Sequence, residues 1–440
     1  MKQLYTLLLF FPILFLVSEQ ISAQQYTISG GIGTPYQESP SASSGIEKLY
    51  FLNTLTDATL TYSSDAASVL FYKYSHSLSD AVLIQNSDIT TTTSGGITTY
   101  TVHFLEDSKG YFASVNGNHQ SAAWIIDYTQ HYPVLNSIST EESEDKCEYI
   151  KLLIDKSDKL LYYTVGGAPI EVGRQYTISY PNMQWDDDQK KYITTTTKLQ
   201  KEFGTEEIIS APLLNTQFTL SGDQYASLIG LSERSIVSDP YTAIASVPRI
   251  DTTVVSSYAT SNLSDGAEGI PAPAEITFMG RANEPVTRYY TWYIYNVNDL
   301  INHIARYTDQ DIKYNFTQQG KYRVVLETAS DGSACVSRDS VEFTIQDWYM
   351  DAPNFFSPDD SPGVNDEFKV AYRSITKFKC TIFNRWGNKI FEWRDPSKGW
   401  DGKYGGKYVN TGVYFYVIEF EASDGQKHTK SGDINILRKK

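Results

Sequence analysis

Short apolar runs alternate with polar residues and turn residues through most of the chain. The run from Gly320 to Leu326 is typical, because Tyr322, Val324 and Leu326 share one strand face and polar residues occupy most of the other. Gly, Pro, Asn, Asp and Ser cluster between such runs. Alternating runs separated by turn residues are typical of half-buried antiparallel strands. The pattern therefore predicts an all-β chain of tandem immunoglobulin-like β-sandwich modules.

Changes in this pattern divide the chain into a leader and four modules. The predicted ranges are 1–23, 24–133, 134–250, 251–347 and 348–440. In the first module, the Ser/Thr-rich tract 90–99 is expected at a turn or a sheet edge. In the second, Trp185 and the run Asp186 to Asp188 precede a Thr-rich strand, which predicts a hairpin with an acidic turn. In the last, Gly387-Asn388 predicts a tight turn within a small seven-stranded sandwich.

Residues 1–23 have the pattern of a cleaved secretory signal peptide. Lys2 precedes an apolar run from Leu7 to Val17, and Ala23 is a small residue before Gln24, where cleavage is expected. The alternative is a membrane anchor. However, a spanning helix needs about 20 apolar residues, and this run is shorter. The mature chain is expected to be soluble.

Composition limits the possible functions. The 440 residues suggest about three or four domains at roughly 100–200 residues each. Aromatic residues are 14%, with 33 Tyr, which indicates packed cores and excludes a disordered chain. The formal net charge is −15, and no long Lys/Arg run is present. Nucleic acid is therefore excluded as an expected partner.

The chain has three cysteines, Cys147, Cys335 and Cys380. An exported protein can form disulfides, but the number is odd and the spacings are wide. We expect each cysteine to be a buried single thiol in a different module, with a bridge as the alternative.

The last module carries a series of motifs in a fixed order. They are the opening PNFFSP at Pro353, GVND at 363–366, IFNRWG at 382–387, GWDG at 399–402, GVY at 412–414 and the tail from Gly432 to Arg438. These motifs resemble the gliding-motility-associated C-terminal domain, the type B sorting domain of the type IX secretion system. The chain departs from the family pattern at 359–363, where DDSPG replaces an Asn/Gly-rich run.

The resemblance implies Sec export, passage through the periplasm and outer membrane, and an extracellular or cell-surface location. The implied partners are the type IX secretion machinery and an outer-membrane barrel. For recognition we select Arg438, Lys439 and Lys440, together with the exposed part of the last strand, which could add to a partner's sheet. The alternative is that this end is only a frayed polar tail.

The segment 251–347 resembles a PKD domain, an immunoglobulin-like module. The resemblance rests on the strand with Trp292, the YNF turn at 314–316 and the strand that begins GKYRVVL at Gly320. It implies a spacer or interaction role without catalysis.

Candidate chemistry elsewhere is sparse. The sequence has neither a zinc-binding His-Glu-x-x-His nor a Gly-x-Ser-x-Gly motif. Asp359, Asp360, Asn365 and Asp366 offer oxygen ligands that would suit calcium, or they order a loop through Asx turns. Asp186 to Asp188 could bind a metal or form a solvated turn. Trp386, Trp393 and Trp400 could form a sugar platform, but packing within the fold is the expected role.

These observations leave three hypotheses for function. The first is a non-enzymatic, exported multi-domain protein that acts as an adhesin or as a structural or interaction protein, with no cofactor. The second is a glycan-binding surface module that assists polysaccharide capture. The third is a hydrolase whose site is not apparent in the sequence. A partner could be a surface glycan or another extracellular protein.

Overall fold

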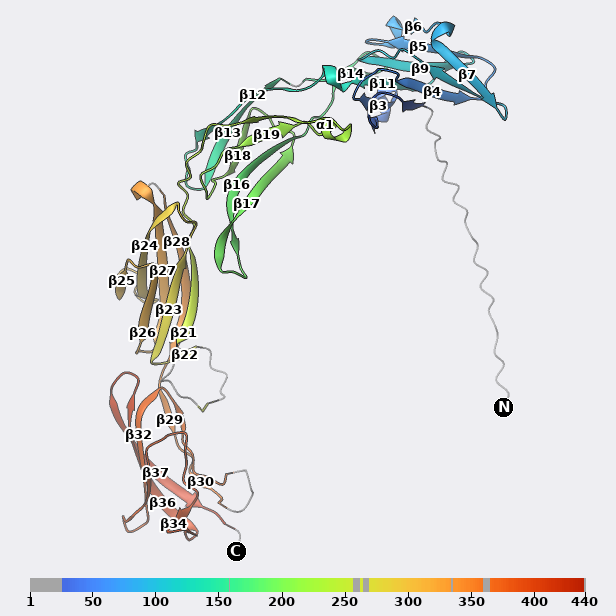
Figure 1. Ribbon diagram of the computed structural model, residues 1–440. Helices are drawn as coiled ribbons and strands as arrows, with labels where there is room; N and C mark the ends of the chain where they lie inside the picture. The colour runs from blue at the N-terminus through green and yellow to red at the C-terminus, as the bar shows by residue number, and fades with distance from the viewer. Residues whose placement is uncertain are drawn as a thin grey trace, which may run out of the picture.

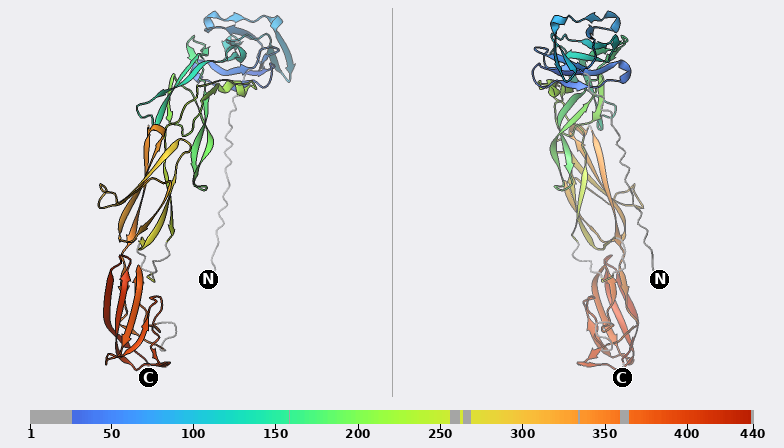
Figure 2. Two further views of the ribbon diagram at one scale, coloured as in Figure 1. Left: turned by 60° about the vertical axis from the view of Figure 1, so that its left-hand side comes forward. Right: turned by 90° about the vertical axis from the view of Figure 1, so that its right-hand side faces the viewer.

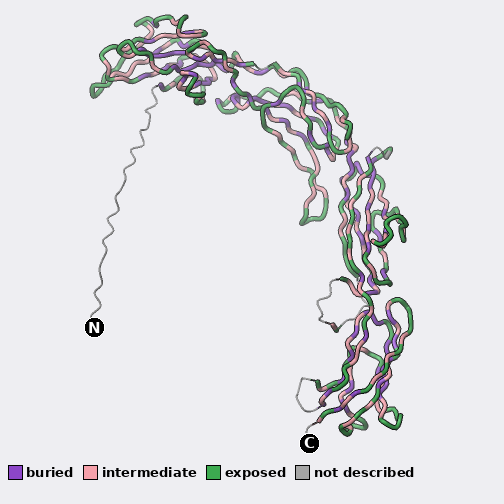
Figure 3. The backbone as a smooth tube through the Cα atoms, turned by 180° about the vertical axis from the view of Figure 1, so that it is seen from behind, coloured by how far each residue is buried: buried purple, intermediate pink, exposed green. Residues whose placement is uncertain are grey.

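The computed structural model describes residues 26–438 except 158, 256–261, 264–268, 334 and 359–364. Four β-rich modules follow one another along the chain and lie end to end in a bent rod, with the C-terminal module at the end far from module 1 (Figures 1 and 2). Each module has its own stretches of buried positions (Figure 3). The predicted all-β class of tandem immunoglobulin-like sandwiches is confirmed.

Module 1 packs two sheets face to face. One has the order β1 (Tyr26–Ser29), β4 (Thr59–Ser64), β8 (Ile97–Val102) and β7 (Ile89–Ser94). The other has the order β2 (Tyr36–Glu38), β3 (Ile46–Leu52), β11 (Ala122–Asp127), β9 (Lys109–Val115), β5 (Val69–Tyr74) and β6 (Val82–Leu83), with β10 (Asn118–His119) beside β9. The polar tract at 90–99 forms the β7–β8 hairpin at a sheet edge, as predicted. Short 3-10 turns lie at Ala42–Ser44, Leu78–Asp80, Asn86–Asp88 and Tyr128–Gln130.

Module 2 is a second sandwich. One sheet has the order β12 (Val134–Glu142), β13 (Tyr149–Ser157) and β18 (Glu206–Ser210). The other has the order β17 (Lys191–Lys201), β16 (Tyr176–Asp186), β19 (Thr219–Gly222) and β20 (Arg234–Val237). It also contains the hairpin β14 (Leu161–Tyr163) and β15 (Pro169–Glu171) and the short helix α1 (Gln224–Leu228). The predicted acidic hairpin is β16–β17, whose tip lies on the inner side of the bend (Figure 1). Asp186 orders its turn by accepting the backbone N–H groups of Asp188 and Gln189.

Module 3 is the expected immunoglobulin-like sandwich. One sheet has the order β21 (Arg249–Val255), β23 (Ala274–Arg281) and β26 (Asp311–Phe316). The other has the order β22 (Ile270–Pro271), β28 (Val336–Gln346), β27 (Gly320–Ser330), β24 (Thr287–Asn296) and β25 (Ala305–Tyr307). Trp292 is fully buried between the sheets. The alternation predicted in β27 is confirmed, since Tyr322, Val324 and Leu326 are all buried.

The C-terminal module has a five-stranded sheet, β30 (Phe355–Phe356), β37 (Lys427–Ile436), β36 (Gly412–Ala422), β32 (Ile375–Phe383) and β33 (Lys389–Trp393). Two smaller sheets accompany it. One pairs β29 (Tyr349–Asp351) with β31 (Ala371–Arg373), and the other is the hairpin of β34 (Lys403–Tyr404) and β35 (Lys407–Tyr408). The turn predicted at Gly387-Asn388 joins β32 to β33. Trp393 and Trp400 are buried, as expected, but the prediction was wrong for Trp386, which is exposed at this turn.

The cysteine prediction was wrong for two of the three residues. Cys147 of module 2 and Cys335 of module 3 form a disulfide, with their Cα atoms 5.5 Å apart. The bridge forms because the two modules meet where these residues lie, although 188 positions separate them in sequence. Cys380 is the expected buried free thiol, and burial raises its pKa.

Candidate functional site

The glycine and tryptophan motifs of the C-terminal module lie at points of close packing. Trp400 is fully buried, and its indole N–H donates to the carbonyl of Lys403 over 2.9 Å. A Cβ atom on Gly399 would lie 2.7 Å from the carbonyl oxygen of Phe368, and one on Gly432 would lie 2.6 Å from the Tyr416 hydroxyl oxygen. Contacts this short exclude a side chain, so these glycines are required by the fold.

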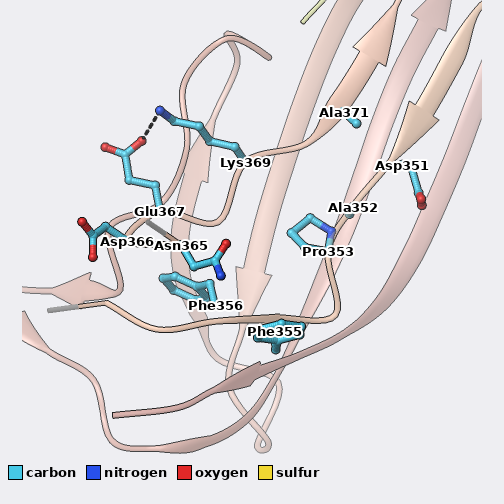
Figure 4. Close-up of a pocket in the computed structure, with 10 residues that line it drawn as sticks. All are labelled: Asp351, Ala352, Pro353, Phe355, Phe356, Asn365, Asp366, Glu367, Lys369 and Ala371. Atoms are coloured by element: carbon cyan, nitrogen blue, oxygen red, sulfur yellow. Dashed lines mark ion pairs between the residues drawn. The ribbon is translucent and has the colours of Figure 1, made fainter. Parts of the chain in front are cut away.

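The module has an open pocket of 660 Å³ beside the five-stranded sheet (Figure 4). It is lined by Asp351, Ala352, Pro353, Phe355, Phe356, Asn365, Asp366, Glu367, Lys369 and Ala371. Two ion pairs lie at this pocket, Glu367–Lys369 at 2.9 Å and Asp351–Lys430 at 2.7 Å. The hydrogen bond from Lys430 lowers the pKa of Asp351, so this carboxylate remains charged. The pocket therefore offers a polar, charge-paired surface to a partner.

The predicted calcium ligands are only partly described. Asn365 and Asp366 are neighbours at the pocket wall, whereas Asp359 and Asp360 lie outside the described residues. The backbone carbonyl of Asn365 accepts a hydrogen bond from the N–H of Ser357 over 2.9 Å, and its φ angle is +55°. These contacts order the backbone at the end of the loop. Within the described ranges, no group of three His, Cys, Asp or Glu residues could hold a metal ion.

The C-terminal tail folds back onto the module. The guanidinium carbon of Arg438 lies 4.7 Å from the ring centroid of Tyr408, a cation–π distance. Lys439 and Lys440 lie outside the described residues, as do Ala23 and Gln24 at the expected cleavage point.

The last strand, β37, pairs with β36 along its length, and it pairs with β30 only at Asn435 and Ile436. The segment from Lys427 to Asp433 thus has a strand neighbour on one side among the described strands. It carries lysines at 427 and 430, and such charges protect an exposed edge from uncontrolled pairing. This segment is where an added strand would find free backbone groups.

Comparison with known proteins identifies this module. Residues 350–436 match the family model described as the CHU_C type IX secretion signal domain. The C-terminal module is a type IX secretion signal domain. It marks the chain for handling by the type IX secretion machinery and for export to the cell surface or extracellular space. The resemblance stated from the sequence is thereby confirmed.

The modules ahead of the secretion signal domain have fewer matches. Residues 139–238 match a fibronectin type III domain, which corresponds to module 2. No curated protein matches the chain. Among solved structures, dimeric latent PorU from Porphyromonas gingivalis is similar at 11% identity and a TM-score of 0.18, over 74% of this chain and 36% of that chain. The chain thus spans about a third of that protein's length, and the likeness is too distant to bear on function.

Within the described residues, no helix is long and apolar enough to cross a membrane.

Proposed function

We propose that the chain is a non-enzymatic stalk that holds module 1 at a distance from the secretion signal domain, and that it acts as an adhesin or a structural surface protein. The observation that supports this most is that each of the three module junctions is held by specific buried or hydrogen-bonded contacts. Modules joined only by loose linkers move independently by default. Contacts of this kind oppose such motion.

The junction of modules 1 and 2 is a shared hydrophobic core. Tyr225 of α1 stacks on Phe51 of β3, with ring centroids 4.0 Å apart, and its hydroxyl donates to Glu38. The Tyr128 hydroxyl donates to Asp223 over 2.6 Å, and Asp223 lies 3.0 Å from the Arg174 guanidinium in a fully buried ion pair. The two modules therefore cannot separate without exposing apolar surface and buried charge.

The junction of modules 2 and 3 contains buried polar side chains. Asn283 is fully buried, and its side-chain amide donates to the carbonyls of Leu213 and Ala245. Its side-chain oxygen accepts the N–H of Val247 over 2.9 Å. The Cys147–Cys335 disulfide crosses the same junction. This junction is therefore held covalently as well as by buried hydrogen bonds.

The junction of module 3 and the secretion signal domain includes a hydrogen bond from the Arg373 guanidinium to the carbonyl of Asp347 and a set of bonds made by Asn262. The side-chain amide of Asn262 donates to the carbonyl of Val370 over 2.7 Å, and its side-chain oxygen accepts the N–H of Tyr372 over 2.9 Å. Its own backbone N–H donates to the carbonyl of Tyr372 over 3.3 Å. These bonds tie the segment between β21 and β22 to the next module.

Small-angle X-ray scattering of the purified full-length chain tests the stalk. A compact globule of this length would have a radius of gyration of about 22 Å. Strands of 11 residues make modules about 35 Å long, so four in a row give about 140 Å. A straight rod of that length would have a radius of gyration of about 40 Å, and the bend places the expected value between about 22 and 40 Å. A value near 22 Å, or a profile that requires freely jointed modules, would refute the stalk.

The biological role needs a second test in cells. We expect a strain that lacks the gene to lose attachment to its surface, and the full chain to restore it. A chain without residues 350–436 should be made but should not reach the outside, and so should not restore attachment. Normal attachment without the gene would refute the adhesin role. Export of the truncated chain would contradict the role of the secretion signal domain.

A specific outer-membrane barrel partner is part of the proposal. The free edge at 427–433 and the position of Arg438 over Tyr408 support a docking surface at this end of the domain. Ser431→Pro would remove a backbone donor from that edge, whereas Ser431→Ala retains it. Export that is equal for the two variants, with both folded, would contradict this docking mode.

Glycan binding is the second candidate function, and one observation favours it. On the outer face of module 3, the rings of Tyr293 and Tyr295 lie 6.3 Å apart at an interplanar angle of 28°. They line an open pocket of 520 Å³ with Arg323, Arg338 and Leu300. Partly exposed aromatic rings with nearby polar groups suit the binding of sugars. Tyr293→Ala should abolish retardation in polysaccharide-containing gels, and Tyr289→Ala on the same strand should not.

A further inference from the structure

A third cavity lies where module 1 meets the stretch of module 2 around β14. It has a volume of 410 Å³, and its wall combines residues from the loop after β5, from β9 and β11, and from the region of β14. The lining includes Lys109, Trp124, His131, Lys159 and Tyr163. Ligand pockets of roughly 300–1,000 Å³ typically occur between domains, so its size and place suit a small ligand.

Ser108, His131 and Asp107 meet at this cavity, but not in the arrangement of a hydrolytic triad. The Asp107 carboxylate lies 2.8 Å from Nε2 of His131, and the Ser108 hydroxyl lies 3.3 Å from the same nitrogen. A triad requires the nucleophile and the acid to contact opposite ring nitrogens. Asp107 also accepts the N–H of Asp127 over 2.8 Å and the Ser108 hydroxyl over 2.9 Å. The carboxylate is thus fully engaged within the protein.

The groups that remain available at this cavity are donors. Trp124 is fully buried, and its indole N–H has no hydrogen-bond partner in the described structure. This nitrogen is fully buried, so a ligand in the open cavity does not reach it, and the available donors are the two lysines. Lys109 donates one of its three N–H bonds to the Ser75 hydroxyl over 2.6 Å. Lys159 is exposed at the rim, and neither lysine has a carboxylate partner among the described residues.

The cavity also offers aromatic surface. The rings of His76 and Tyr163 lie edge to face, with centroids 4.8 Å apart, and both line the wall. Aromatic rings pack against the C–H faces of sugars, while lysine ammonium groups bind carboxylates.

We propose that this cavity binds a carboxylated sugar, such as a uronic acid residue of an acidic polysaccharide. The ligand carboxylate lies between Lys109 and Lys159, and the sugar packs against the partly exposed Tyr163. This site lies in a different part of the chain from the tyrosine pair of module 3. It depends on neither the stalk nor that pair.

Isothermal titration calorimetry of the full-length chain with trigalacturonate tests this. We expect saturable binding, and no binding of the fully methyl-esterified trimer, which lacks the charge. Loss of a charged hydrogen bond should weaken binding at least about tenfold in Lys109→Met and in Lys159→Gln. Lys313→Gln, an exposed lysine on β26 of module 3, is the matched control and should bind as the parent does.

Several outcomes would overturn the proposal. These are absence of binding heat with trigalacturonate, equal affinity for the methyl ester, and unchanged affinity in both lysine variants. Competition by trialanine at equal affinity would also overturn it, because the site would then recognise a peptide carboxylate and not a sugar. Lys159→Gln keeps the test interpretable if Lys109→Met misfolds, since Lys159 is exposed.

Discussion

Asn283→Ala is the most direct test of whether the junction of modules 2 and 3 is a structural element. The substitution removes an amide that is fully buried and that bonds to three backbone groups. It leaves the carbonyls of Leu213 and Ala245 and the N–H of Val247 without these partners. Alanine cannot replace any of the three bonds, and the site has no exposure to water that could do so.

The expected cost follows from these unpaired groups. A buried backbone donor or acceptor that loses its partner costs about 1–3 kcal/mol. Three such groups would cost about 3–9 kcal/mol, and local relaxation brings the expected loss to the lower part of this range, about 3–4 kcal/mol. For a cooperative unit of two modules, 1 kcal/mol shifts the melting temperature by about 2–4 °C. We therefore expect a decrease of about 6–16 °C in the transition of modules 2 and 3.

Differential scanning calorimetry of the full-length chain measures this decrease. Asn298→Ala is the matched control, because Asn298 is an exposed asparagine in the loop after β24. An exposed substitution of this kind usually changes stability by less than about 0.5 kcal/mol. If Asn283→Ala and Asn298→Ala melt within about 2 °C of each other, the buried amide does not stabilise the junction and the reasoning is wrong.

Three further predictions follow from other contacts. Cys335→Ser should lower the stability of the junction by about 2–5 kcal/mol in denaturant titrations under oxidising conditions. Cys380→Ser is the control and should leave the stability of the junction unchanged. Equal unfolding of the parent and Cys335→Ser would contradict the disulfide. Burial opposes ionisation of Asp107, but hydrogen bonds from His131, Asp127 and Ser108 outweigh it and lower its pKa. The resulting stability is present above the ordinary pKa near 4 and is lost as pH falls through the lower folded pKa. Melting curves of Asp107→Asn and the parent should thus differ at neutral pH and converge in acid, and a constant difference would contradict this. Gly432→Ala should destabilise the secretion signal domain by about 1–3 kcal/mol, because the added Cβ would meet the Tyr416 hydroxyl. Ser431→Ala is the neighbouring control, and equal melting temperatures of the two variants would contradict the close contact.

The sequence predicted local structure well because strand and turn patterns are local. The alternation at Tyr322, Val324 and Leu326 specified which face of β27 is buried, and the acidic run after Trp185 specified a turn. The ordered motifs after Pro353 identified the secretion signal domain, because each marks a turn or close contact that this fold requires.

Contacts between modules could not be predicted in the same way. Periodicity shows that a residue is buried but not which residue covers it, so Tyr225 gave no sign that it packs on Phe51. Asn283 is a polar residue with a proline two positions later, which is also the pattern of an ordinary surface loop. Cys147 and Cys335 lie so far apart in sequence that their spacing does not indicate whether they form a disulfide. The lysine donors of the junction cavity likewise come from separate segments, Lys109 on β9 and Lys159 ahead of β14.

The shared core of modules 1 and 2 also sets the order in which the chain can fold. Leu160, Val172, Tyr225 and Ile229 are buried in the same cluster as Phe51 and Trp124. A chain made and exported N-terminus first presents residues 24–133 well before those four residues arrive. One apolar face of module 1 therefore stays uncovered until the chain has emerged to Ile229. Until then this face is open to chaperones, to proteases and to other copies of the chain.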